Sequence, residues 1–278
     1  MRQKQKGFFS LRIQVVGGNL TAENIKAVAD VAEKYGKGYV HMTSRQGIEI
    51  PFINFEDIEE VRAKLADGGV KPGVCGPRVR TVTACQGSEI CPSGCIDTYS
   101  LAKKLDEHYF GRELPHKFKF GVTGCQNNCL KAEENDIGVK GGMEVSWIAD
   151  KCINCGVCEK ACREDAIKCT GTEVTIDYDK CTNCGRCVKS CPTDAWEGKS
   201  GYIVSFGRSP TTFRISCAVI PSLSHPDSLN DLIWSTVKFS RGVPLRFAFN
   251  RSSAESSGIN ASTIFFSSTS CAGVCFIS

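Results

Sequence analysis

The chain has 278 residues and a formal net charge of +4, with 34 Lys and Arg against 30 Asp and Glu. This length can bury one or two cores, and basic residues are mixed with nearly as many acids, so no nucleic-acid partner is expected. No apolar run is long enough to cross a membrane, and the apolar stretch near the start is interrupted by Arg12 and Gln14. We therefore expect a soluble, cytoplasmic protein.

The chain begins with a strand pattern and then a helix pattern. Residues 11–16 have strand character, Gly17 and Gly18 turn the chain, and Thr21 can cap a helix. The apolar positions of this helix have helical spacing and form one face: Ile25, Val28, Ala29 and Ala32.

Two short strands and a second helix follow. The strands are expected at 38–41 and 47–52, and Asn54 is the expected N-cap of a helix with one apolar face, formed by Ile58, Val61 and Leu65. The order strand, helix, strand, strand, helix predicts a small α+β unit over 1–68, with both helices on one face of a sheet.

The part of the chain from 69 to 207 contains an internal repeat. Residues 69–146 carry cysteines, basic residues and glycines around one helix expected through 97–108. The repeat occupies 147–195, and residues 196–207 have the pattern of a strand that returns to the preceding domain. The repeat is therefore predicted to be inserted, not appended.

The composition changes after residue 207. Residues 201–278 contain 17 Ser, against 8 in the first 200, and only one Lys and one Glu, so good helix formers nearly vanish. We treat 208–278 as an atypical Ser-rich tail with two competing explanations, translation out of frame and a divergent or disordered extension. Sequencing the gene near codon 207 distinguishes them.

Eight of the 18 cysteines form two copies of one pattern. Both runs read Cys-x2-Cys-x2-Cys-x3-Cys, which is the spacing of bacterial two-cluster ferredoxins, in which the fourth cysteine ligates the other cluster. One 4Fe-4S cluster is thus predicted at Cys152, Cys155, Cys158 and Cys191, and the other at Cys181, Cys184, Cys187 and Cys162. Zinc would favour two pairs separated by a longer loop. Arg163 stands where the pattern often has the proline seen at Pro192, which could alter the local backbone.

A second constellation has a different spacing. It reads Cys85-x5-Cys91 and then Cys125-x3-Cys129, the latter within Thr-Gly-Cys-Gln-Asn-Asn-Cys. Here the chain resembles the sirohaem-containing sulfite and nitrite reductases. The resemblance implies a 4Fe-4S cluster on these four cysteines, a sirohaem iron that shares Cys129, and cofactor contacts from Asn127 and Asn128. A third cluster without haem is the alternative, and Gln126, where the family usually has proline, could loosen the turn that presents Cys129.

Basic residues near these cysteines are candidates for binding an oxyanion. Arg45 lies in Thr-Ser-Arg-Gln and Lys117 and Lys119 lie in Leu-Pro-His-Lys-Phe-Lys, segments that resemble the anion-binding segments of the same reductases. Arg80, just before Cys85, is the fourth candidate and is preferred to Arg78. On composition alone each would be a solvated surface charge, and the arginines could also bind the sirohaem carboxylates.

Seven other Cys and His residues receive no firm role. Cys95 could compete for a metal because it closely follows Cys91, and His116 could donate a proton, although a structural histidine is the commoner case. The remaining cysteines are expected to be small buried or tail residues: Cys75, Cys169, Cys217, Cys271 and Cys275.

Taken together, residues 8–207 resemble the small anaerobic sulfite reductase type, the C subunit that bears sirohaem and ferredoxin clusters. The resemblance implies an α+β fold with a ferredoxin-like half domain, a sirohaem reductase domain and an inserted two-cluster ferredoxin domain. It implies reduction of sulfite to sulfide with sirohaem and three 4Fe-4S clusters, fed by a separate donor, a ferredoxin or flavoprotein subunit. Nitrite reduction to ammonia and an electron-transfer subunit without sirohaem are the alternatives, and the oligomeric state is left open.

Overall fold

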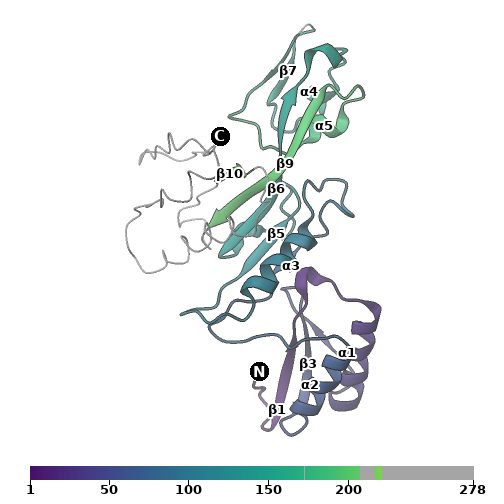
Figure 1. Ribbon diagram of the computed structural model, residues 1–278, viewed down its shortest axis with the longest axis vertical. Helices are drawn as coiled ribbons and strands as arrows, with labels where there is room; N and C mark the ends of the chain where they lie inside the picture. The colour runs from purple at the N-terminus through teal and green to yellow at the C-terminus, as the bar shows by residue number, and fades with distance from the viewer. Residues whose placement is uncertain (172, 207–216, 221–278) are drawn as a thin grey trace, which may run out of the picture.

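The computed structural model shows three parts in line (Figure 1), with the first α/β unit at one end, a sheet with helix α3 in the middle and the inserted unit at the other end. The structure describes residues 1–171, 173–206 and 217–220. The expected Ser-rich tail lies outside these residues, except for strand β10 (Cys217–Ile220), whose backbone pairs with β9. In the part of the chain that the structure describes, no helix has the length and apolar character needed to cross a membrane.

The first unit has the predicted order of elements: β1 (Phe8–Ile13), α1 (Ala22–Tyr35), β2 (His41–Met42), β3 (Ile48–Asn54) and α2 (Ile58–Asp67). The strands form an antiparallel sheet in the order β1-β3-β2, and both helices pack on one side of it (Figure 1). Strand β1 ends earlier than expected because residues 16–18 already form a short 3-10 turn, η1 (Val16–Gly18).

One of the two predicted helix caps is correct. Thr21 accepts a hydrogen bond from the Asn24 amide at 3.1 Å, and the Asn24 side chain in turn accepts one from Thr21, which confirms the cap of α1. The prediction for Asn54 is wrong, because it ends β3 and Asp57 holds the N-cap position of α2. Asn54 donates to Asp57 Oδ2 at 3.2 Å instead, across a turn that separates strand from helix.

The helices present their apolar faces to the sheet, although not at every predicted position. Val28 and Ala32 of α1 and Val61 and Leu65 of α2 are buried. Ile25 is 54% exposed, because the buried face of α1 continues through Val31 and Tyr35 instead. The helical spacing therefore predicted the position of the buried face on α1, but not which residues form its margins.

The central sheet has the order β10-β9-β6-β5-β4. Strands β4 (Thr83–Ala84), β5 (Phe120–Thr123) and β6 (Ile137–Trp147) run parallel, and β9 (Trp196–Phe206) pairs antiparallel with β6. Helix α3 (Thr98–Tyr109), capped by Asp97, packs on this sheet through a shared core that includes Leu101, Leu105 and Phe120. The short 3-10 turn η2 (Ala132–Glu134) joins β5 to β6.

The inserted unit sits at the far end of the long β6–β9 ladder. These strands pair without interruption from Ile137↔Phe206 to Trp147↔Trp196, so the ladder runs from the central sheet into the insert. Between them lie η3 (Ala149–Lys151), α4 (Val157–Ala161), β7 (Ile167–Cys169), β8 (Val174–Ile176) and α5 (Arg186–Ser190). Its small core includes Val145, Ile167, Val174 and Trp196. Gly198, Lys199 and Ser200 lie within β9 itself.

The half domain is joined to the central domain by side-chain hydrogen bonds. Gln46 pairs with the peptide group of Ala84, accepting from its N–H at 3.0 Å and donating to its carbonyl at 2.7 Å. Asp106 of α3 accepts from Gln14 and from the Val82 amide at 2.9 Å. Burial raises the pKa of Asp106. Since β4 leads directly into Cys85, these contacts fix the start of the second cysteine constellation.

Candidate functional site

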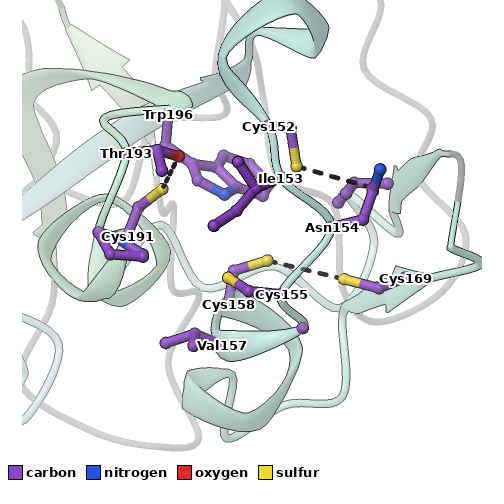
Figure 2. Close-up of a pocket in the computed structure, with 13 residues that line it drawn as sticks. Cys152, Ile153, Asn154, Cys155, Val157, Cys158, Cys169, Cys191, Thr193 and Trp196 are labelled. Carbon is purple, nitrogen blue, oxygen red and sulfur yellow. Dashed lines mark hydrogen bonds between the residues drawn. The ribbon is translucent and has the colours of Figure 1, made fainter.

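Two pockets in the insert are each lined by one of the predicted ligand sets. The first is lined by Cys152, Cys155, Cys158 and Cys191, and the second by Cys162, Cys181, Cys184 and Cys187. Figure 2 shows the first pocket, with its four cysteines and with Cys169 beside Cys158. The fourth cysteine of each run thus lies in the pocket of the other run, the exchange that the ferredoxin pattern predicts.

The two runs have the same backbone. Each short helix follows a glycine in the left-handed region, Gly156 with φ 69° before α4 and Gly185 with φ 68° before α5. In each run a backbone amide donates to the sulfur of the fourth cysteine, Ala166 to Cys162 Sγ and Ala195 to Cys191 Sγ, both at 3.3 Å. Such donors favour the thiolate that iron requires. The internal repeat in the sequence is therefore a repeat in the structure.

Arg163 leaves the backbone of the fourth cysteine as it is in the run with proline. Cys162 has φ −75° and ψ 118°, and Cys191, which precedes Pro192, has φ −74° and ψ 122°. A residue before proline is restricted to this extended region, and Cys162 adopts it without that restriction.

All thiols of the insert except the exposed Cys155 are buried or partly buried. Burial raises the pKa of Cys187 to about 12 and also raises the pKa of Cys181. For Cys191 burial acts in the same direction, but hydrogen bonds from Thr193 and Ala195 outweigh it and lower the pKa. Iron that binds such sulfurs displaces the thiol proton.

The donor sets suit clusters better than single ions. Within residues 1–171, 173–206 and 217–220, no three His, Cys, Asp or Glu side chains meet as ligands of one metal ion. Each set of four thiols instead lines the rim of a pocket, and a 4Fe-4S cube takes four thiolates around its outside. The residues of both pockets therefore fit the group that the spacing predicts.

The second constellation forms where parallel strands end. Cys85 directly follows β4, and Gly124 and Cys125 follow the neighbouring β5. The Cys85 amide donates to Val122 O at 3.0 Å, and the Gly124 amide donates to Cys85 Sγ at 3.0 Å. The carboxyl edge of parallel strands is the usual place for a ligand in such sheets.

Close packing of glycines brings the cysteine loops together. A Cβ on Gly124 would lie 3.0 Å from Gly87 Cα, and one on Gly141 would lie 2.3 Å from Gly124 O. A Cβ on Gly94 would lie 2.5 Å from the Ser88 amide nitrogen. Because no side chain fits at these points, the loop that carries Cys91 can fold back onto the turn that carries Cys125.

The four thiols of this constellation lie near one another. Burial raises the pKa of Cys125, and the thiols of Cys91, Cys129 and Cys85 raise it further, while a hydrogen bond from the Asn127 backbone opposes the shift. Cys129 is exposed, whereas the other three are partly buried. Gln126 ties the turn to β6 by donating to Gly141 O at 3.3 Å. A group that approaches from outside therefore meets Cys129 first.

Asn128 braces the turn that presents Cys129. Its backbone is in the left-handed region with φ 50°, and its side-chain oxygen accepts from the Ala132 amide at 2.8 Å. Its side-chain nitrogen donates to Glu133, which also pairs with Lys140. Burial opposes the ionisation of Glu133, but the bond to Lys140 outweighs it and the pKa of Glu133 is lowered. Asn127 is exposed in the same turn.

The two candidate arginines bond to backbone carbonyls. Arg45 donates to Asn135 Oδ1 at 2.8 Å and to the carbonyls of Thr81 and Phe120 at 3.1 and 3.3 Å. Arg80 donates to the carbonyls of Val74 and Gly76, the latter at 3.0 Å. Arg45 thus joins the half domain to the second domain, and Arg80 joins segments within the second domain, structural roles that the sequence pattern did not indicate.

The two candidate lysines precede β5 on extended chain. They flank Phe118, which forms a parallel bridge with Val79, and Lys117 is exposed. The Lys119 amide donates to Asp136 Oδ2 at 2.8 Å. Because alternate residues of an extended chain point the same way, both lysines share one side of the segment that leads to Cys125.

Cys169 and Lys189 were not predicted to act at these sites, and Cys95 was considered only as a possible competitor for a metal. Cys169 lies 3.7 Å, sulfur to sulfur, from Cys158, and burial raises its pKa to about 11. Cys95 is 7% exposed, and burial raises its pKa with smaller contributions from Cys125 and Cys184. Lys189 contacts the loop after Cys91. The unusual number of cysteines was the signal for Cys169 and closeness to Cys91 the signal for Cys95, whereas nothing in the sequence singled out Lys189.

The domains of the chain match known family models in this order. Residues 1–68 match the nitrite/sulfite reductase ferredoxin-like half domain, and residues 75–145 match the nitrite and sulphite reductase 4Fe-4S domain. Residues 145–168 and 174–197 match the 4Fe-4S binding domain. The chain therefore belongs to the nitrite and sulfite reductase family of oxidoreductases.

Two proteins named as sulfite reductases are each about one third identical in sequence to this chain. The chain is 34% identical over 180 residues to the C subunit of the anaerobic sulfite reductase of Salmonella typhimurium, which covers 60% of this chain and 53% of the relative. It is 35% identical over 166 residues to the coenzyme F420-dependent sulfite reductase of Methanocaldococcus jannaschii, covering 59% of this chain and 27% of that one. The chain thus spans about half the length of the Salmonella relative.

The fold matches that of a solved reductase. Dissimilatory sulfite reductase I superposes with a TM-score of 0.66 at 21% identity, over 84% of this chain and 64% of that chain. This confirms the predicted fold class, a ferredoxin-like half domain and a reductase domain with an inserted ferredoxin unit.

Proposed function

We propose that the chain reduces sulfite to sulfide with a bound sirohaem, using electrons relayed through three 4Fe-4S clusters. The observation that carries this proposal is the meeting of Cys85 and Cys125 at the ends of two parallel strands, with Cys91 and Cys129 within electrostatic reach of Cys125. Neither a ferredoxin nor a zinc module needs this second set of four thiols.

The exposed thiol of Cys129 fits a role shared between a cluster and a haem iron. The other three thiols of the set are partly buried, so Cys129 is the one that a large planar cofactor can reach. Sirohaem, when bound, supplies the iron at which the sulfur of sulfite is reduced. The chain contributes the brace formed by Asn128, Glu133 and Lys140, which holds the turn around Cys129.

The basic candidates would bind the oxyanion and supply protons. Lys117 and Lys119 lie on one side of the segment before β5, and their charge compensates that of sulfite. Arg45 extends from the half domain to carbonyls of the second domain, and Arg80 joins segments within the second domain, with either sulfite or the sirohaem carboxylates as their further partner. Asn127, exposed between Cys125 and Cys129, is the remaining candidate for a cofactor contact.

The electrons would come from a separate protein. A ferredoxin or flavoprotein subunit is the expected class of donor, because the sequence carries no flavin or nicotinamide motif. The Salmonella relative is named as one subunit of a reductase, which agrees with a role inside a larger assembly. A cytoplasmic location and the oligomeric state stay predictions.

Steady-state assays with both anions test the proposed substrate. With a reduced dye as donor, the anaerobically purified protein should have a higher kcat/KM for sulfite than for nitrite. A higher kcat/KM for nitrite would indicate that the protein reduces nitrite to ammonia. If the protein shows iron–sulfur absorption but no sirohaem bands, the result would indicate that the chain is an electron-transfer subunit.

A lysine variant tests the proposed anion site. We expect Lys117→Gln to raise KM for sulfite about tenfold, the effect of one lost charge-assisted bond. Lys103→Gln, an exposed lysine of α3 that pairs with Glu107, is the control and should leave KM unchanged. Equal KM values in the two variants would show that Lys117 does not bind sulfite.

A further inference from the structure

Lys189 connects the insert to the loop of the second constellation. The residue lies on α5, between the ligands Cys187 and Cys191, and its Nζ donates to the carbonyls of Pro92 and Gly94, both at 2.8 Å. Pro92 directly follows Cys91, and Gly94 is two residues further along the same loop. One ammonium group thus bridges a loop of the reductase domain and the helix that carries ligands of the insert.

Further contacts place the second run of the insert against the same loop. Cys95 is buried, and its Sγ lies 3.8 Å from Cys184 O. The Cys95 amide donates to Gly124 O at 2.6 Å, next to Cys125. The Met143 amide of β6 donates to Asn183 O at 2.8 Å. The buried Cys95 therefore bonds both to Cys184 of the insert and to Gly124, the residue before Cys125.

Among the residues that the structure describes, the first run of the insert has no such neighbour. By the repeat spacing, Lys160 on α4 is the counterpart of Lys189, and it is exposed with no side-chain hydrogen bond recorded in the described part of the chain. Cys155 is exposed, and Ile153 and Val157 at the rim of the first pocket are 65% and 37% exposed. Two runs with the same backbone therefore differ in their surroundings: the second contacts the reductase domain, and the first has an exposed thiol and exposed apolar side chains at its pocket.

We propose that Lys189 is a positioning residue that docks the second run onto the Cys91 loop. The set Cys162, Cys181, Cys184 and Cys187 is then the inner cluster site, and the set Cys152, Cys155, Cys158 and Cys191 is the outer one, which receives electrons from the donor protein. The inference rests on the proposed relay. In the step that Lys189 supports, one electron passes from the inner site to the site of Cys85, which oxidises the former and reduces the latter with no bond made or broken.

Lysine variants of the holoprotein test the docking. Anaerobically purified wild type, Lys189→Ala, Lys189→Arg and the matched control Lys160→Ala are reduced with a one-electron dye, and rapid-freeze EPR follows arrival of the electron at the Cys85 site. We expect Lys189→Ala to slow this step about tenfold, the effect of losing one or two charge-assisted hydrogen bonds. Lys160→Ala should match wild type, and Lys189→Arg should recover most of the rate because its guanidinium also reaches two carbonyls.

Hydrogen exchange gives a second readout that does not depend on turnover. Amides of residues 91–95 should exchange faster in Lys189→Ala than in Lys160→Ala. If Lys189→Ala loses iron, the comparison is made with Lys189→Met, which keeps an aliphatic side chain of similar length but lacks the ammonium group. Equal transfer rates and equal exchange in the Lys189 and Lys160 variants would overturn the proposal. Absence of sirohaem from all the proteins would instead contradict the proposed function, and the exchange comparison would still decide the docking.

Discussion

The two halves of the insert have the same backbone and differ in what surrounds them. Gly156 and Gly185 have nearly equal φ, and Cys162 and Cys191 accept the same amide hydrogen bond at the same distance. Yet Lys189 docks on the reductase domain, and the first half instead carries the additional thiol of Cys169. The cysteine spacing therefore determines the backbone conformation of each run. The contact with the reductase domain determines which run we propose as the inner cluster site.

The largest expected effect comes from removing one ligand in each half. Cys184→Ser and Cys155→Ser should each lower activity with a protein donor by more than about 100-fold, because ligand loss exceeds the usual effect of a change near a metal site. With a small dye that can reach the inner site, Cys155→Ser should retain clearly more activity than Cys184→Ser. Steady-state assays with both donors measure this, and the reverse order would contradict the inner and outer assignment.

A smaller effect is expected from the thiol that only the first half has. Once Cys158 binds iron, Cys169 is the donor of their S–H···S contact, which stabilises the more negative reduced state. Cys169→Ala should therefore lower the potential of the outer site by about 20 to 60 mV, the equivalent of one weak hydrogen bond. An EPR redox titration measures the potential, with the exposed Cys75→Ala as control. An unchanged or raised potential in Cys169→Ala would show that the contact does not tune the site.

The smallest effect is expected from the two matched glycines. Both have positive φ, so alanine costs about 1 kcal/mol at either position. A Cβ at Gly185 would also lie 2.7 Å from Met143 Sδ, whereas Gly156 has nothing within 4 Å. Gly185→Ala should therefore lower Tm by about 2–4 °C more than Gly156→Ala, as followed by thermal loss of cluster absorption. Equal Tm values would mean that the contact between Met143 and Gly185 adds no constraint.

The comparison also shows what sequence can predict. The cap at Thr21 depends on residues close in the chain, so the local sequence was enough to predict it. The fourth cysteine of each run lies in the pocket of the other run, a long-range arrangement that the repeated spacing indicated. Spacing could not separate Lys189 from Lys160, because they are equivalent within the repeat and differ only in which domain lies beside them. Nor could it show that Arg45 bonds to Thr81 and Phe120 carbonyls, since those partners are brought near by packing of the half domain.

The number and kind of cofactors in the purified protein test the central claim most directly. Iron and acid-labile sulfide counts, combined with an absorption spectrum under anaerobic conditions, should give about twelve cluster irons, from three cubes of four, together with sirohaem bands. About eight cluster irons and no sirohaem bands would contradict the account, because the set Cys85, Cys91, Cys125 and Cys129 would then hold neither a cluster nor a haem.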